Sequence, residues 1–188
     1  MGEELATLLS SADWLSVDHI KTEAATYETA CKLLRGCRYH IVQYIGHGGY
    51  YETSPENSAL LFWERPNRSG NLVAVTANEL RWLLENSSDT RLFHLTCCEG
   101  ARTGSSIDLL DDDYLGIGDG LVQSGVPSVL GYRWPVAAGS ARQMVLAFYR
   151  SWLGHGSPEL ALLDARRDLA SRNKDDLTWA SPILISQR

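Results

Sequence analysis

The sequence predicts a single α/β domain built on a mostly parallel sheet. Short runs rich in β-branched and aromatic residues alternate with amphipathic stretches, the order expected when helices connect parallel strands. A length of 188 residues is enough for one well-packed core and too short for two. Apolar residues make up 44% of the chain and charged residues 21%, which is ordinary globular usage, so we expect the chain to fold.

The first half of the chain should contain two helices and four strands. Residues 24–35 have apolar side chains at helical spacing, and Gly36 follows as a stop signal. Thr76 and Glu79 match a capping box at the start of a second helix, which should end near Asn86. The predicted strands are residues 40–45, 60–63, 72–75 and 91–96, the middle two flanking the turn-rich segment 66–70.

The second half should begin with a loop and continue the alternation. Residues 101–118 are polar and contain three consecutive aspartates, so we expect a mobile loop there. Ser157 and Pro158 have the residue types of a helix cap and first helical position. The predicted elements are a helix over 119–124 ended by Gly125, a strand over 126–132, helices over 140–153 and 158–171, and a strand over 182–185.

Charge, hydropathy and cysteine usage narrow the classes of function. The formal charge is −6, from 17 basic and 23 acidic residues without a Lys/Arg cluster, so we expect no direct nucleic-acid partner. No apolar stretch approaches the roughly 18 residues of a membrane helix, so no membrane association is expected. The four cysteines, at 31, 37, 97 and 98, do not have the spacing of a secreted disulfide framework. These features favour a cytoplasmic protein with free thiols.

Two strand ends carry residues with the chemistry of a nucleophile and its base. His47 follows the strand over 40–45 and Cys98 follows the strand over 91–96, each near a glycine. Reactive groups of α/β sheets gather at the carboxyl ends of strands, so the two side chains can meet if these strands are neighbours. A free thiol has a pKa of about 8.5, and an adjacent imidazole converts it into the attacking thiolate.

The glycines around His47 suggest a role for the backbone. The run Gly46-His47-Gly48-Gly49 permits a sharp turn after the strand and close approach of a ligand to the main chain. Attack on an amide carbonyl creates an oxyanion that fixed N–H groups can stabilise. The N–H groups of Gly48 and Cys98 are the candidates for this oxyanion hole.

These residues lie within motifs that resemble a known family. Cys98-Glu99-Gly100, with His47 51 residues upstream, fits the caspase arrangement, although Thr96-Cys97 stands where that signature has Gln-Ala. The closer resemblance is to CHAT peptidases, caspase-like domains attached to TPR arrays and similar to separase. It covers about residues 20–185 and is carried by Tyr-Ile-Gly-His-Gly at 44–48, Leu-Thr-Cys-Cys-Glu-Gly at 95–100, Gly-Leu-Val-Gln-Ser-Gly-Val-Pro-Ser-Val at 120–129 and Arg-Trp-Pro-Val at 133–136.

The resemblance implies a fold and an activity. The fold is a caspase-hemoglobinase-like three-layer sandwich with a mostly parallel central sheet. The activity is hydrolysis of peptide bonds in a protein substrate, with Cys98 as nucleophile and His47 as general base, and without a cofactor. Family members are controlled by a regulatory domain or a partner protein such as a TPR array. The missing first strand before residue 24 further suggests that residues 1–188 are one domain of a longer multidomain protein.

The resemblance also implies where a substrate binds. Tyr132, Arg133 and Trp134, at a strand end, would form a wall along which an extended peptide pairs by its backbone. Asp119 is the candidate acidic group for a basic residue before the cut, a preference of separase. Both assignments have structural alternatives: Trp134 as a packed side chain at a strand end, and Asp119 as a helix cap.

Other functions stay open at this point. A non-catalytic scaffold could keep the fold, and a thiol redox sensor could use Cys97 with Cys98. A nucleotide-binding module is weakest because the glycines lack the GxGxxG pattern. A zinc site made from His47, His94, Cys97 and Cys98 has suitable donors, but adjacent cysteines rarely fit one tetrahedral ion. The remaining candidates, Cys31, Cys37, Cys97, His40 and His94, are expected to be structural.

Overall fold

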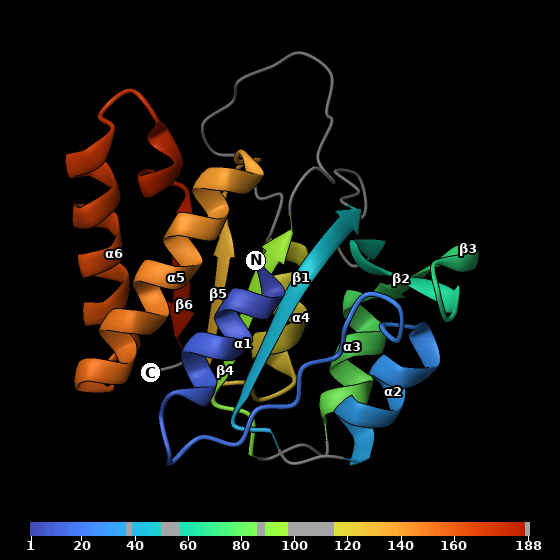
Figure 1. The fold of residues 1–188 in the computed structure, drawn as a ribbon. Helices are drawn as coiled ribbons and strands as arrows, with labels where there is room; N and C mark the ends of the chain where they lie inside the picture. Colours follow the sequence, from blue (N-terminus) through green and yellow to red (C-terminus); the bar gives the residue numbers. More distant parts are fainter. Residues whose placement is uncertain (37–38, 50–56, 86–88, 98–114, 187–188) are drawn as a thin grey trace. The chain divides into compact units, whose positions relative to one another are not determined.

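The computed structural model describes residues 1–36, 39–49, 57–85, 89–97 and 115–186 (Figure 1). Its contacts divide the chain into two compact units. The helical unit comprises residues 1–21 and 136–182, and the sheet unit comprises residues 22–135 and 183–188.

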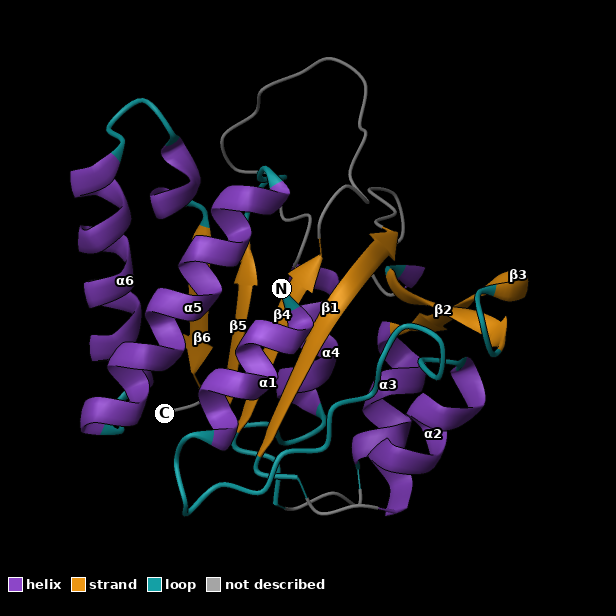
Figure 2. Cartoon of the chain, viewed as in Figure 1, coloured by secondary structure: helices purple, strands orange, loops and turns teal. Residues whose placement is uncertain are grey.

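A six-stranded mixed sheet forms the sheet unit, with strand order β3-β2-β1-β4-β5-β6. The strands are β1 (Ile41–Gly49), β2 (Ala59–Arg65), β3 (Ser69–Thr76), β4 (Leu92–Cys97), β5 (Ser128–Tyr132) and β6 (Pro182–Ser186). Its three central strands, β1, β4 and β5, are parallel, whereas β2 and β3 are antiparallel. Figure 2 shows β6 running opposite to β5. The predicted α/β class is therefore confirmed, and the parallel arrangement is limited to the centre of the sheet.

Three helices of the sheet unit share a core with the sheet. They are α2 (Tyr27–Gly36), α3 (Ala77–Leu84) and α4 (Leu115–Gln123). Leu34 of α2, Leu80 of α3 and Leu121 of α4 belong to one buried apolar cluster with Phe93 and Leu95 of β4. Because Phe93 and Leu95 are two residues apart in a strand, they lie on one face of the sheet. This face is called the packed face below.

Local signals in the sequence set several of these boundaries. The Thr76 hydroxyl accepts a hydrogen bond from the Glu79 N–H at 3.2 Å, as the predicted cap requires. The Glu79 carboxylate instead accepts from the Tyr27 hydroxyl at 2.6 Å, which ties α3 to α2 and raises the pKa of Tyr27 to about 12. In the hairpin between β2 and β3, Asn67 and Arg68 have φ of 59° and 58°, the backbone of a tight turn that matches strand twist.

Other boundaries differ from those predicted from the sequence. The first predicted helix begins three residues late, at Tyr27, because Thr26 caps it by accepting from the Thr29 N–H at 3.2 Å. Residues 115–118, predicted as the end of a loop, form the first turn of α4, while the rest of that predicted loop lies outside the described residues. The helix α1 (Gly2–Ser10) and the short helix η2 (Leu177–Ala180) were not predicted.

The helical unit is built from α1, η2, α5 (Ala138–His155) and α6 (Pro158–Arg172). Figure 1 shows α5 and α6 side by side. Gly156 ends α5 with a φ of 75°, a backbone conformation that glycine adopts without a steric penalty. Ser157 then caps α6 as predicted by accepting from the Leu160 N–H at 3.3 Å. Met144, Val145 and Phe148 of α5 are buried, and Trp152 is partly buried.

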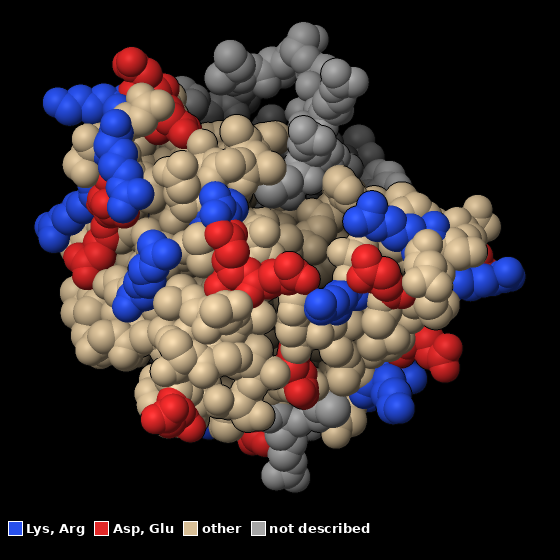
Figure 3. Space-filling model, in the orientation of Figure 1, with Lys and Arg blue, Asp and Glu red and all other residues tan. Residues whose placement is uncertain are grey.

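Two further observations concern the distribution of surface charge and the hydropathy of the helices. On the face drawn in Figure 3, acidic and basic side chains are interspersed among uncharged ones. Among the helices of the described ranges, none combines the length and the apolar character that crossing a bilayer would demand.

Candidate active site

β1 carries His47 within an extended strand. Residues 47–49 of β1 pair antiparallel with β2: His47 with Leu61, Gly48 with Leu60 and Gly49 with Ala59. The predicted end of this strand at residue 45 is therefore wrong, because pairing with β2 continues the strand to Gly49. His47 is exposed at this end of β1.

The two faces of β1 are different. Tyr44 packs against the apolar cluster, so Tyr44, Gly46 and Gly48 lie on the packed face. Gln43, Ile45 and His47 alternate with them and therefore lie on the opposite face. That opposite face is called the open face below, because both Ile45, at 37% exposure, and His47 are exposed there.

Gly46 makes room for the Tyr44 side chain. A Cβ atom at Gly46 would lie 2.5 Å from the Tyr44 Oη and 2.6 Å from its Cζ. The hydroxyl of Tyr44 lies 2.8 Å from the carbonyl oxygen of His47 and 2.8 Å from that of Leu61, and its one proton is shared between them. Tyr44 thereby fixes the main chain of β1 at His47 against β2. The sequence reasoning missed this role, although a tyrosine two residues before a glycine in a strand is a usable signal.

Burial keeps the Tyr44 hydroxyl protonated. Burial, with a smaller contribution from the nearby Cys97, raises the pKa of Tyr44 well above its usual range. The hydroxyl therefore remains a hydrogen-bond donor to the two carbonyl groups at physiological pH.

Gly48 lies beside Cys97. A Cβ atom at Gly48 would lie 3.4 Å from the Cys97 Sγ and 3.6 Å from the Ala59 carbonyl oxygen. Cys97 is 2% exposed and belongs to the apolar cluster, and Cys31 is also buried, as predicted for both. Since Cys97 lies on the packed face, it is on the other side of the sheet from His47.

The position of His47 and Cys97 on opposite faces of the sheet argues against the zinc site and the redox sensor. His47 and Cys97 cannot bind one ion from opposite faces of a sheet. In the described part of the chain, no group of three or more His, Cys, Asp or Glu side chains is suited to hold a metal. A redox sensor that uses Cys97 with Cys98 would require Cys97 to leave the apolar core, because an oxidant cannot reach Cys97 while it is buried.

β1 and β4 are neighbouring parallel strands, which the proposed meeting of imidazole and thiol requires. The register runs from Ile41 with Leu92 to Gly46 with Cys97. Cys98 itself lies outside the described residues, as do Cys37, Glu99 and Gly100. The pairing of His47 with the Cys98 thiol, and the oxyanion role of the Gly48 N–H, stay predictions.

The other histidines of these strands differ from His47. His94, in the middle of β4, is 1% exposed, and burial lowers its pKa to about 3. Its imidazole is therefore neutral at physiological pH. His40 precedes β1, and its carbonyl oxygen accepts hydrogen bonds from Arg91 N–H at 2.8 Å and Leu92 N–H at 3.1 Å.

The predicted substrate residues differ in their place in the fold and in their access to solvent. β5 ends at Tyr132, which is 1% exposed, so its side chain is not accessible to a peptide. Arg133 is exposed, and its guanidinium lies 5.6 Å from the ring centroid of Trp134. Asp119 is the fifth residue of α4, so its alternative role as a helix cap is wrong, and its side chain is outside the described part. Peptide binding by these four residues stays a prediction.

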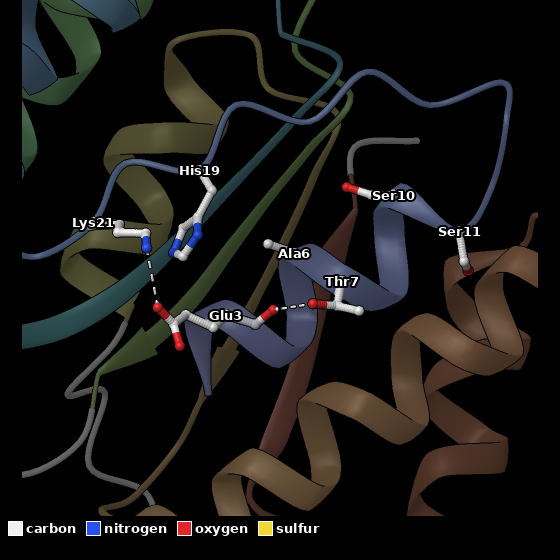
Figure 4. Close-up of a pocket in the computed structure, with 7 residues that line it drawn as sticks. All are labelled: Glu3, Ala6, Thr7, Ser10, Ser11, His19 and Lys21. Carbon is white, nitrogen blue, oxygen red and sulfur yellow. Dashed lines mark hydrogen bonds and ion pairs between the residues drawn. The ribbon is translucent and has the colours of Figure 1, made fainter.

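Residues of one unit line a pocket of about 580 Å³ (Figure 4). It is in the helical unit, beside α1, and its lining includes Glu3, His19 and Lys21. The Lys21 ammonium donates to the Glu3 carboxylate at 3.2 Å. None of the predicted site residues lines it.

One comparison with known proteins agrees with the sequence resemblance. The family model described as CHAT domain matches residues 3–187. No curated protein matches the sequence.

Proposed function

Because this chain belongs to the CHAT domain family, which is caspase-like and related to peptidases, we propose that it is a cysteine endopeptidase. In this proposal Cys98 is the nucleophile and His47 is the general base, and the substrate is a protein. The family membership supports a peptidase-related fold, and the assignment of the reaction to this chain rests on the residues discussed next.

One observation carries the proposal: the parallel register between β1 and β4. Gly46 pairs with Cys97, and the next residues in the sequence are His47 and Cys98. Continuation of the same register would pair these two residues at the spacing of neighbouring strands, about 4.8 Å. It would also direct both side chains to the open face, since Cys97 lies on the packed face.

The chemistry follows from such a pair. The His47 imidazole takes the proton of the Cys98 thiol, and the thiolate attacks the carbonyl carbon of the scissile peptide bond. The C–N bond breaks as the imidazolium gives its proton to the leaving amine, which leaves a thioester. A water molecule, deprotonated by His47, then hydrolyses the thioester and releases the thiolate. N–H groups of Gly48 and Cys98 stabilise the oxyanion in both steps.

The proposal extends to the substrate and to regulation. An extended peptide lies along Tyr132, Arg133 and Trp134, and Asp119 selects a basic residue before the cut. A regulatory domain or a partner such as a TPR array controls the activity in the cytoplasm. Both compact units form one domain, a three-layer caspase-hemoglobinase-like sandwich, which the match of a single family model to residues 3–187 supports.

Labelling with an electrophilic peptide probe tests the proposal. We expect the probe to label the wild type at Cys98, to label the Cys97→Ala variant equally, and to leave Cys98→Ala unlabelled. The His47→Ala variant should react more slowly at neutral pH, because its thiol keeps an ordinary pKa of about 8.5. Peptide mass spectrometry identifies the modified residue. Labelling at Cys97, or equal rates with and without His47, would contradict the proposed dyad and favour the scaffold alternative.

A further inference from the structure

A row of polar side chains crosses from β1 to β4 on the open face. Gln43 belongs to this face of β1, and His94 and Thr96 belong to the same face of β4, because they alternate with the packed Phe93, Leu95 and Cys97. Thr96 is 1% exposed and His94 is 1% exposed. Polar groups in such surroundings are costly unless they have hydrogen-bond partners.

The Gln43 amide spans the two strands. Its Nε2 lies 3.0 Å from the Thr96 Oγ1 and 3.2 Å from the His94 carbonyl oxygen, both in β4. It also lies 3.0 Å from the carbonyl oxygen of Tyr44 in its own strand. An amide has two N–H groups, so these three acceptors share two protons. One side chain thus adds a cross-strand connection to the backbone ladder of β1 and β4.

The bridge is close to the end of the ladder. Thr96 is paired in register with Ile45, so the Gln43 side chain reaches two residues beyond its own register partner, His94. His47 is the next residue of the open face after Ile45. The Gln43–Thr96 contact is therefore level with Ile45, the residue of the open face that comes directly before His47. The last registered pair of the two strands is Gly46 with Cys97.

We propose that Gln43 is a positioning residue, which bridges β1 to β4 through Thr96 and so sets the distance between His47 and the end of β4. This inference rests on the proposed function, because the distance matters chemically only if His47 acts on Cys98. Thiolate and imidazolium attract each other more strongly when they are closer, so a fixed distance keeps the thiol pKa low. Removing the bridge lets the strand ends move apart and raises the thiol pKa toward its ordinary value.

The pH dependence of Cys98 alkylation tests this role. The rate of reaction with iodoacetamide is measured between pH 5 and pH 9 by peptide mass spectrometry for the wild type, Gln43→Met and Thr96→Val. Methionine fills the space of glutamine and has no N–H group, and valine has the shape of threonine without the acceptor. We expect the alkylation rate of Gln43→Met at pH 6.5 to fall roughly fivefold, the effect of one typical hydrogen bond, and the profile to move to higher pH.

Controls separate positioning from stability. Gln143→Met changes an exposed glutamine of α5 and should leave both the profile and the melting temperature unchanged. Thr96→Val should shift the profile in the same direction as Gln43→Met, and the double variant should shift it no further. Thr96→Val also carries the test if Gln43→Met does not fold. A merely structural glutamine would change the melting temperature and leave the profile where it is.

The outcomes distinguish this inference from the proposed function. A shifted profile in His47→Ala, Gln43→Met and Thr96→Val supports both. A shift in His47→Ala with an unshifted profile in Gln43→Met and Thr96→Val overturns the positioning role and leaves the dyad intact. An ordinary thiol profile in the wild type that His47→Ala does not change overturns the dyad, and the positioning role with it.

Discussion

The packed and open faces of β1 differ in what their residues do. On the packed face, Gly46 accommodates the Tyr44 side chain, and Gly48 lies beside Cys97. On the open face, His47 is exposed and Gln43 bridges to β4. The difference teaches that Gly46, the first glycine of the Gly-His-Gly motif, serves the packing of one face, while the candidate chemistry belongs to the other.

The largest effect expected on the packed face is that of Gly46→Ala. The new methyl group would meet the Tyr44 ring at 2.5–2.6 Å, so the ring must move and give up its contacts with the His47 and Leu61 carbonyl groups. We expect a loss of about 1–3 kcal/mol in the free energy of unfolding, measured by urea denaturation.

A second change shows whether the ring is responsible. Tyr44→Leu removes the part of the ring that Gly46→Ala would meet, so the double variant should lose less than the sum of the single losses. Additive losses would mean that Gly46 is needed for another reason, and the account of the packed face would fail.

A smaller effect is expected for Tyr44→Phe, which removes only the hydroxyl. Two carbonyl groups lose a shared donor, so the free energy of unfolding should fall by about 1 kcal/mol. Since the folded pKa of Tyr44 is raised, its contribution is complete below the unfolded pKa of about 10 and is lost as the pH rises through the folded pKa. Denaturation curves at pH 7 and pH 11 measure both effects. A phenylalanine variant as stable as the wild type at pH 7 would show that the hydroxyl does not hold the strand.

The smallest effect is expected for Gly48→Ala. Its Cβ atom would be 3.4 Å from the Cys97 Sγ and 3.6 Å from the Ala59 carbonyl oxygen, which are ordinary contacts. The free energy of unfolding should change by no more than about 0.5 kcal/mol. The backbone N–H is retained, so probe labelling at Cys98 should persist. A large loss of stability here would contradict the contrast drawn between Gly46 and Gly48.

Local chemistry made much of the fold predictable. The cap at Thr76, the Ser157-Pro158 helix start and the turn between β2 and β3 depend on residues within a few positions of one another. The helix α1 was missed because nine residues are marginal as an isolated helix. Burial of Leu5 and the ion pair of Glu4 with Arg142 of α5 stabilise it.

The candidate site was predictable only in part. The strand that carries His47 can be read from the chain, but the glycines around His47 suggested a turn, and pairing with β2 overrides that local preference. Tyr44 and Gln43 were missed because their partners lie on other strands, and the register that joins them is not local. The choice of Cys98 over Cys97 stays a prediction that the burial of Cys97 favours.

Oxidation of the His47→Cys variant, in a Cys97→Ala background, tests the central claim most directly. Neighbouring strands about 4.8 Å apart fall within the Cα separations of about 4.4–6.8 Å that disulfides span. We expect a disulfide between positions 47 and 98, seen by peptide mass spectrometry and reversed by dithiothreitol, and none in an Ile45→Cys control. Failure of positions 47 and 98 to cross-link, with both thiols still open to alkylation, would contradict a catalytic pair at these strand ends.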